Sequence, residues 1–262
     1  MDNPGLYLDR MRAQAPLVHN ITNFVAMNIM ANVLLAAGAS PAMVHAREEV
    51  AEFAGLSQAL SVNIGTLDPA WAEAMEMAAR VMAEAGRPWV LDPVGVGATR
   101  FRQDVCARLL DLRPTVIRGN ASEIMALAGI AARGRGADAA DPVAAAETAA
   151  RDLARRTGAV VAVSGPVDYV TDGALAFRVA NGHALMPRVT ALGCALNGVI
   201  AAFAVGQPAL PATVAAMAYY GLAGERAAQA AAGPGGFQPA FLDALHALTP
   251  QAVTAGARVS GA

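Results

Sequence analysis

Lysine is absent from this 262-residue chain, in which all 19 basic residues are arginine. The absence excludes a P-loop kinase, whose lysine binds the phosphates, and a protein kinase, which needs a lysine on a strand. It also excludes an enzyme that forms a Schiff base through lysine. Any phosphate chemistry in this chain must therefore use arginine, backbone amides and metal ions.

Charge and cysteine are scarce as well. Charged residues make up 15% of the chain and its formal net charge is −2. Because the basic residues are scattered, we expect no binding of nucleic acid. The two cysteines are Cys106 and Cys194, and the N-terminus lacks the apolar run of a signal peptide. These features predict a cytoplasmic protein with reduced thiols.

Hydrophobic residues make up 55% of the chain, and residues 189–224 carry no charge. A membrane-spanning helix needs about 20 strongly apolar residues. This span consists mostly of alanine and glycine and is interrupted by Asn197, Gln207, Pro208 and Pro211. We therefore predict no membrane span but two packed core helices, split near residues 206–208. The length and composition predict a single domain over residues 1–262, with a large core and a sizeable protein interface.

Short apolar runs alternate with longer helical patterns, which predicts an α/β fold with a largely parallel sheet. Strands are expected over 17–20, 41–44, 60–64, 89–91, 115–117 and 159–163. Helices are expected over 23–37, 48–58, 68–85, 101–110, 122–127 and 141–157. A tight turn at Asp172-Gly173 predicts a hairpin of strands 169–171 and 174–179. Residues 131–140 are small, polar and glycine-rich, and we expect them to form a surface loop.

Polar residues gather where these strands end. In parallel sheets of this kind, ligands bind beyond the carboxyl ends of the strands. The strand ends carry Asn23, Asn63, Asp92, the segment 118–123 and Ser164. Each is an ordinary loop residue when taken alone. Together they predict a ligand site at one edge of the sheet.

Two of these groups have a specific chemical use. Asp92 follows a buried strand and precedes a glycine-rich turn, so it is either a turn aspartate or part of a metal or phosphate site. Asn120 and Glu123 supply two oxygen ligands one helical turn apart. Mg²⁺ is usually held by one or two carboxylates, waters and phosphates. The same pair also fits a helix capping box. Arg118 is well placed to bind phosphate oxygens.

Residues 189–194 precede a long uncharged helix that we expect to begin at Ala195. The free amides and the dipole at a helix start attract anions, phosphate above all. Gly193 lets the backbone approach a ligand closely because it has no Cβ. The helix dipole would favour the thiolate form of Cys194. The alternative is that Cys194 is an ordinary buried thiol.

Five motifs make the chain resemble the hydroxyethylthiazole kinases over nearly its whole length. They are VHNITN at 18–23, GASPAM at 38–43, LDPVGVGA at 91–98, RGNASEI at 118–124 and Gly193-Cys194. The resemblance implies a ribokinase-like three-layer αβα sandwich. It also implies ATP-dependent phosphorylation of the primary alcohol of 4-methyl-5-(2-hydroxyethyl)thiazole in thiamin salvage. A homotrimer with active sites between neighbouring subunits is implied as well.

The resemblance further implies a role for each site residue. Cys194 stands where related sugar and pyridoxal kinases have an aspartate base. We expect its thiol to assist catalysis rather than to act as the main base. Ala191-Leu192 replaces the glycine-rich residues of many family members, which puts the thiazole contact at Ala191 in question. The residues implied to bind the thiazole are Asn23, Met43 and Ala191, and those implied to bind ATP are Arg118, Ser164 and Asn120. Asp92 and Glu123 are implied to bind Mg²⁺. Residues Ala191–Cys194 are implied to form an anion hole, in which Gly193 and Cys194 are the catalytic residues.

Three other functions stay open from the sequence alone. One is acyl transfer with Cys194 as nucleophile and His19, His45 or His183 as base, but it leaves Asp92 without a role. A second is a trimer that senses a nucleotide or a thiazole without catalysis. A third keeps the kinase chemistry but acts on another small alcohol, such as a pyrimidine or a pyridoxal-like compound.

Overall fold

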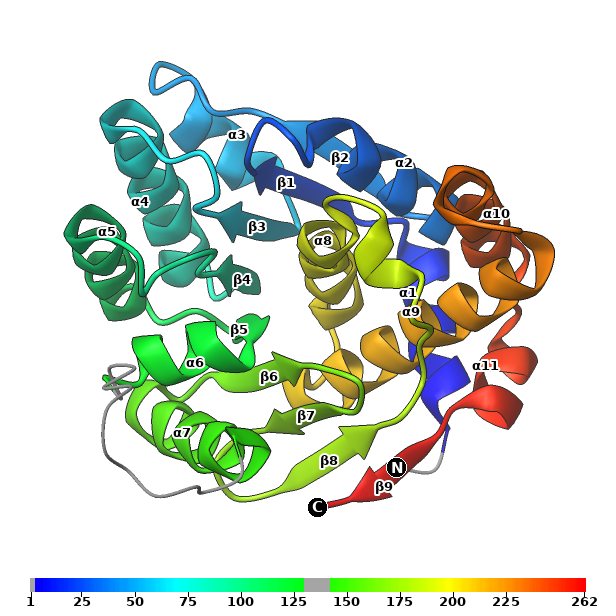
Figure 1. The fold of residues 1–262 in the computed structure, drawn as a ribbon. Coiled ribbons are helices and arrows are strands. Elements are labelled where there is room, and N and C mark those ends of the chain that lie inside the picture. Colours follow the sequence, from blue (N-terminus) through cyan, green and yellow to red (C-terminus); the bar gives the residue numbers. More distant parts are fainter. Residues whose placement is uncertain (1–2, 130–141) are drawn as a thin grey trace.

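The computed structural model of the chain describes residues 3–129 and 142–262, and Figure 1 shows its helices and strands. The loop expected at 131–140 therefore lies outside the described residues. Strands and helices alternate along most of the chain, as the sequence predicts. In chain order they are α1 (Pro4–Gln14), β1 (Leu17–Ile21), α2 (Met27–Ala37), β2 (Ser40–Met43), α3 (Val50–Leu56), β3 (Ala59–Asn63), α4 (Pro69–Glu84), β4 (Trp89–Asp92), α5 (Arg100–Asp111), β5 (Val116–Asn120), α6 (Ala121–Leu127), α7 (Pro142–Thr157), β6 (Val160–Ser164), β7 (Asp168–Thr171), β8 (Ala176–Val179), the 3₁₀ turn η1 (Met186–Arg188), α8 (Leu192–Ala204), α9 (Ala209–Ala230), α10 (Pro234–Ala247), α11 (Pro250–Gly256) and β9 (Val259–Gly261).

The described strands form one sheet in the order β2-β1-β3-β4-β5-β6-β7-β8-β9. Strands β1 to β6 pair in parallel, and β7, β8 and β9 continue the sheet in antiparallel pairs. The β7–β8 hairpin is confirmed, and its turn uses Gly173 at a left-handed φ of +92°. Strand β9, at the C-terminal end, is an element that the sequence patterns do not predict. The parallel pairing brings the carboxyl ends of β1 to β6 to one edge of the sheet.

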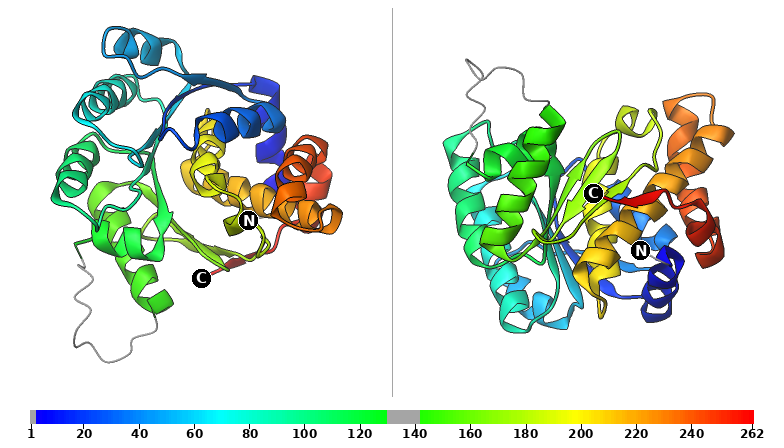
Figure 2. Two further views of the ribbon diagram at one scale, coloured as in Figure 1. Left: turned by 45° about the horizontal axis from the view of Figure 1, so that its top comes forward. Right: turned by 90° about the horizontal axis from the view of Figure 1, so that it is seen from below.

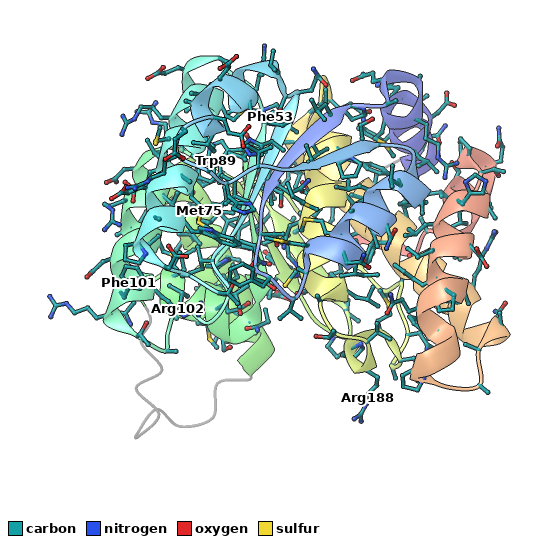
Figure 3. The ribbon with its side chains drawn as sticks, turned by 90° about the horizontal axis from the view of Figure 1, so that it is seen from above. Phe53, Met75, Trp89, Phe101, Arg102 and Arg188 are labelled. Atoms are coloured by element: carbon teal, nitrogen blue, oxygen red, sulfur yellow. The ribbon has the colours of Figure 1, made fainter. Side chains whose placement is uncertain are left out.

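Helices cover both faces of the sheet, so the three-layer arrangement is confirmed (Figure 2). Helices α1, α2 and α8 to α11 bury their apolar side chains on one face, where Phe203 and Tyr219 are among the largest core residues. Helices α3 to α7 cover the other face, where Met75 and Trp89, labelled in Figure 3, are buried. The sheet thus separates two apolar cores, and its carboxyl edge remains for polar side chains.

The uncharged span 189–224 forms two core helices, α8 and α9, which confirms that prediction. No helix within residues 3–129 and 142–262 is long and apolar enough to cross a membrane. Small residues let α9 pack closely against its neighbours. A Cβ at Gly221 would lie 2.6 Å from the backbone of Asn181. The abundance of alanine and glycine therefore reflects close packing of buried helices.

Two element boundaries near the site differ from the sequence-based expectation. Helix α2 begins at Met27 rather than residue 23, because Asn23 Oδ1 accepts a hydrogen bond from the Ala26 amide (3.0 Å) and holds a turn before the helix. Strand β5 continues to Asn120 rather than ending at residue 117, because Arg118, Gly119 and Asn120 all pair with β6. These polar residues therefore belong to the strand itself.

The start of α8 is a third difference, and it bears directly on the anion hole. The helix begins at Leu192, whereas the sequence pattern predicts a start at Ala195, three residues later. Ala191 is its N-cap and adopts a left-handed backbone at φ +61°. An α-helix leaves the amides of its N-cap and first three residues without partners inside the helix. The earlier start makes these the amides of residues 191–194.

Candidate active site

Asp92 ends β4 at the carboxyl edge of the sheet and is only 2% exposed. Its Oδ2 accepts hydrogen bonds from Asn63 Nδ2 (2.6 Å) and from Asn197 Nδ2 (2.5 Å). Asn63 ends the neighbouring strand β3, and Asn197 lies in the second turn of α8. The sheet and the helix above it therefore hold this carboxylate from two sides.

The protonation of Asp92 is finely balanced. Burial raises the pKa of its carboxyl group to about 7, and the negative charge of Glu123 adds to the rise. The positive charge of Arg118 and the hydrogen bonds from Asn63 and Asn197 act in the opposite direction. A metal ion binds a carboxylate in its deprotonated form, so a divalent cation beside Asp92 would displace the proton.

Glu123 and Asn120 form the capping box at the start of α6. Asn120 Oδ1 accepts from the Glu123 amide (2.9 Å), and Glu123 Oε2 accepts from the Asn120 amide (2.9 Å). The other carboxylate oxygen of Glu123 accepts from the Gly95 amide (3.0 Å) in the loop after β4. An ionised carboxylate has about four acceptor positions, so Glu123 keeps capacity for a metal-bound water. The capping role is therefore compatible with a metal role.

The donor set near Asp92 and Glu123 suits a sparsely held magnesium ion. Residues 3–129 and 142–262 contain no cluster of three or more His, Cys, Asp or Glu side chains that would form a metal cage. Mg²⁺ does not need one, because it keeps several waters and uses substrate phosphates as ligands. The two carboxylates influence each other electrostatically, as the raised pKa of Asp92 indicates. These residues fit an ion bound chiefly through water and phosphate.

Arg118 connects three elements at the same edge. Its two terminal nitrogens donate to the carbonyl of Gly193 (2.9 Å) and to Ser164 Oγ (2.7 Å). Ser164 Oγ in turn donates to the Gly119 carbonyl (3.2 Å). Gly193 lies directly against this side chain, because a Cβ there would be in van der Waals contact with the guanidinium at 3.4 Å. Strands β5 and β6 and the start of α8 thus bring an arginine, a hydroxyl and exposed backbone together.

The first turn of α8 is held in place by a side chain of the neighbouring helix α9. Tyr220 of α9 donates its hydroxyl hydrogen to the Leu192 carbonyl (2.8 Å). The Ala195 amide closes the first helical bond to the Ala191 carbonyl (2.9 Å). The amides before it, on residues 191–194, are the group that a helix start offers to an anion. The residues expected to form the anion hole are therefore the N-cap and the first three residues of α8.

Cys194 differs from the expectation that the helix dipole would favour its thiolate. Burial raises the pKa of the Cys194 thiol, and the nearby charge of Asp92 raises it further. The hydrogen bond from Asn23 Nδ2 to the sulfur (3.4 Å) opposes this rise without cancelling it. The prediction of a favoured thiolate is therefore wrong, because a buried site beside a carboxylate penalises a second negative charge.

The three histidines considered as a base for Cys194 have other neighbours, although Nδ1 of His19 and Nδ1 of His45 are buried without a hydrogen-bond partner. His19 Nε2 contacts the Val44 carbonyl (2.5 Å), and the ring of His45 packs on Trp71 with centroids 4.6 Å apart. His183 Nδ1 accepts from the Leu185 amide (3.2 Å). With a protonated thiol and these contacts, the geometry does not favour cysteine-based acyl transfer.

The structure brings most of the sequence-predicted site residues into three hydrogen-bonded groups. The first contains Asn23, Asp92 and Cys194, because Asn23 Nδ2 also donates to Asn63 Oδ1 (2.8 Å). The second contains the phosphate candidates Arg118, Ser164 and Gly193, and the third contains Asn120 and Glu123. All three groups lie at the carboxyl edge of the parallel strands.

Met43 and Ala191 stand apart from these hydrogen-bonded groups. Met43 ends the edge strand β2, two strands away from Asn63, and packs against the apolar core on the α8 side of the sheet. Ala191 packs against the same core and caps α8. Their side chains are apolar, so the hydrogen-bond pattern does not connect them to the site.

The sequence patterns assign no role to two residues that hold the site. Asn63 is one of the strand-end residues that predict a ligand site, and Asn197 is a polar interruption of an apolar span. Both donate to the buried Asp92. A signal was present for Asn197, since it follows Cys194 by three residues and therefore lies on the same face of the helix.

Comparison with known proteins gives a consistent family. The sequence profile described as the Hydroxyethylthiazole kinase family matches residues 8–251. A hydroxyethylthiazole kinase of Cereibacter sphaeroides is 67% identical over 262 residues, which is 100% of both chains. One of Rhizobium leguminosarum bv. trifolii is 59% identical, over 99% of this chain and 98% of its own.

Solved structures agree. A hydroxyethylthiazole kinase protein from Pyrococcus horikoshii OT3 superimposes with a TM-score of 0.92 and 42% identity, covering 99% of this chain and 98% of its own. Pyridoxal kinase from Staphylococcus aureus, at a TM-score of 0.61 and 16% identity, covers 80% of this chain and 88% of its own and shares the ribokinase-like fold. On its full-length sequence match and its fold, the chain belongs to the hydroxyethylthiazole kinase family.

Proposed function

We propose that the chain transfers the γ-phosphoryl group of ATP to the primary hydroxyl of 4-methyl-5-(2-hydroxyethyl)thiazole, a step of thiamin salvage. Relatives named for this activity match the chain over its full length. The observation that carries the proposal is the hydrogen-bonded group of Arg118, Ser164 and Gly193 at the start of α8. It provides phosphate recognition in a chain without lysine.

On the phosphate side, Arg118, Ser164 and Asn120 bind ATP. The amides of residues 191–194 form an anion hole for the transferring group, because preorganised donors stabilise the charge that develops there. Arg118 is held on Gly193, so its charge lies beside these amides. Gly193 contributes exposed backbone without side-chain obstruction.

On the metal side, Asp92 and Glu123 would hold Mg²⁺. When bound, Mg²⁺ neutralises negative charge on the phosphates and orients them for in-line transfer. Asn63 and Asn197 keep the carboxylate of Asp92 directed into the site. Gly95 and Asn120 do the same for Glu123 through their backbone amides.

On the acceptor side, Asn23, Met43 and Ala191 line the thiazole site, and Cys194 lies beside Asn23. The thiol of Cys194 stays protonated near neutral pH, because burial raises its pKa. It therefore assists by contact and position. The loose transition state of phosphoryl transfer needs little early removal of the acceptor proton, so positioning and charge neutralisation carry most of the catalysis.

The proposal extends to assembly and location. Residues 1–262 act as one kinase domain, and three copies form a homotrimer with active sites between neighbours. Phe24 and Val25, directly after Asn23, are 63% and 58% exposed, which supports an apolar contact beside the site. The unpaired Cys106 and Cys194 suit the reducing cytoplasm.

The test is ADP release from ATP and Mg²⁺ with a panel of alcohols: hydroxyethylthiazole, a hydroxymethylpyrimidine and pyridoxal. We expect the thiazole to give the highest kcat/KM by at least about tenfold, the discrimination that a few pocket contacts supply. Equal or higher kcat/KM for another alcohol would move the proposal to that substrate. ATP binding without stimulation by any alcohol would favour a sensing role.

A further inference from the structure

Arg102 lies near the start of α5 and reaches two loops at the carboxyl edge of the sheet (Figure 3). One terminal nitrogen donates to the carbonyls of Ile64 (2.6 Å) and Val94 (2.7 Å). The other donates to the carbonyl of Gly65 (2.5 Å). Because these carbonyls follow β3 and β4, a single guanidinium joins the ends of two neighbouring strands.

The loop after β3 supports the acceptor side of the site. The Gly65 amide donates to Asn63 Oδ1 (2.9 Å), the same oxygen that accepts from Asn23. Gly65 also packs directly on Asn23, since a Cβ at Gly65 would lie 2.7 Å from Asn23 Cβ. A shift of this loop would therefore move Asn23 and Asn63 together.

The loop after β4 supports the metal side. Its Gly95 amide donates to Glu123 Oε1 (3.0 Å). Gly95 adopts a left-handed backbone at φ +62°, and a Cβ there would lie 4.0 Å from a terminal nitrogen of Arg102. The carbonyl of Val94, one residue earlier, is the one that Arg102 binds. The guanidinium thus sits next to the peptide that orients Glu123.

These contacts require an arginine. Backbone carbonyls in a partly buried loop need hydrogen-bond partners, and the guanidinium supplies one to each of three, of which that of Ile64 belongs to a buried residue. Its planar fork presents several donors in a fixed arrangement, whereas lysine offers one small ammonium on a flexible stem. The backbone of Arg102 is itself anchored, because its amide donates to Thr99 Oγ1 (3.4 Å) at the helix cap.

We propose that Arg102 is a positioning residue that keeps the acceptor side and the metal side of the site aligned. It acts through the carbonyls of residues 64, 65 and 94 and touches no reacting atom. The inference rests on the proposed function, because alignment matters most for in-line phosphoryl transfer. A misplacement of about 1 Å remote from the reacting atoms can lower a rate by roughly a hundredfold.

The kinetic test compares Arg102→Lys and Arg102→Met with the matched control Arg100→Met. Arg100 is exposed and lies two residues earlier on the same helix. We expect both Arg102 variants to lower kcat at least about tenfold, the effect of losing hydrogen bonds to a charged group. The KM for thiazole and the half-saturating Mg²⁺ concentration should rise together, and the control should match the parent protein. Arg102 variants with kcat and both concentrations unchanged would overturn the proposal, even if their melting temperatures fell.

A second readout does not depend on activity. Amide hydrogen exchange at Gly65 and Gly95 is measured in the substrate-free protein, because both amides are bonded to site side chains. We expect exchange at least about tenfold faster in the Arg102 variants and unchanged in Arg100→Met. Unchanged exchange in the Arg102 variants contradicts the proposal. If the parent protein transfers no phosphate to the thiazole, the proposed function fails, while the exchange rates still show whether Arg102 holds the loops.

Discussion

At the scale of single residues, Arg118 belongs to the candidate phosphate side of the site and not to the candidate acceptor side. Its guanidinium group donates hydrogen bonds both to Ser164 and to the start of α8. The acceptor candidate Asn23 belongs to a different hydrogen-bonded group, with Asn63 and Cys194. We therefore expect the two sides to make separable contributions to substrate binding.

We predict that Arg118→Ala raises the KM for ATP by roughly ten- to a hundredfold, the cost of losing hydrogen bonds from a charged group. The KM for thiazole should change much less. Steady-state kinetics with each substrate varied in turn measure both values. Arg108→Ala is the matched control, because Arg108 pairs with Glu76 on the outer helices. An effect of Arg118→Ala confined to the thiazole would remove Arg118 from the phosphate site.

Which of these residues the sequence could reveal depends on the range of their contacts. Asp92, Arg118 and Asn120 stand at strand ends and Glu123 lies in the first turn of the helix that follows, so local patterns and family motifs identify them. Asn197 donates to Asp92 across 105 positions of sequence; its spacing from Cys194 places it on the same face of the helix but does not identify Asp92 as its partner. The raised pKa of Cys194 has the same origin, since it comes from burial and from the charge of Asp92, which is distant in the sequence.

At the scale of elements, Glu225 ties the C-terminal segment to α9. Its Oε1 accepts from the Gly182 amide (2.9 Å), Asn181 Nδ2 (3.1 Å) and Arg258 (2.6 Å). Burial alone would raise the pKa of Glu225, but these hydrogen bonds outweigh it and hold the pKa below the ordinary value of 4.5. The ionised form is therefore favoured by the fold.

We predict that Glu225→Gln lowers the melting temperature at pH 7 by roughly 2–4 °C, as expected for about one net hydrogen bond. Because the folded pKa lies below the unfolded one, the stabilisation is present above pH 4.5 and is lost as the pH falls through the folded pKa. The difference between the two proteins should shrink from pH 7 to pH 4. Thermal unfolding across this range measures it, and a difference that grows towards acid pH would contradict the prediction.

Helices and strands can be predicted where the sequence pattern that indicates them is long. The split of residues 189–224 into α8 and α9 follows from Gln207 and Pro208, which interrupt an apolar span. Strand β9 covers only Val259–Gly261 and forms by pairing with β8, so its own sequence carries no strand pattern. The start of α8 was misplaced because the left-handed backbone of Ala191 depends on its surroundings.

At the scale of the whole molecule, six parallel strands of one sheet, with helices on both faces, end at a common edge that carries the polar candidate residues. The alternation of strands and helices in the sequence predicts this architecture, and the family motifs fall on the same edge. The strand order and the close packing of α8 over β1, β3 and β4 arise from tertiary contacts. Those contacts convert separate polar motifs into one candidate site.

The most direct measurement is transfer of a label from the γ-phosphate of ATP to hydroxyethylthiazole, with the product identified by mass. The parent protein should yield labelled thiazole phosphate in amounts equal to the ADP released, and only with Mg²⁺ present. Glu123→Gln should need more Mg²⁺ for the same rate, because one negative charge near the metal is lost. Label that appears only as free phosphate, or on no product at all, would contradict phosphorylation of the thiazole by this chain.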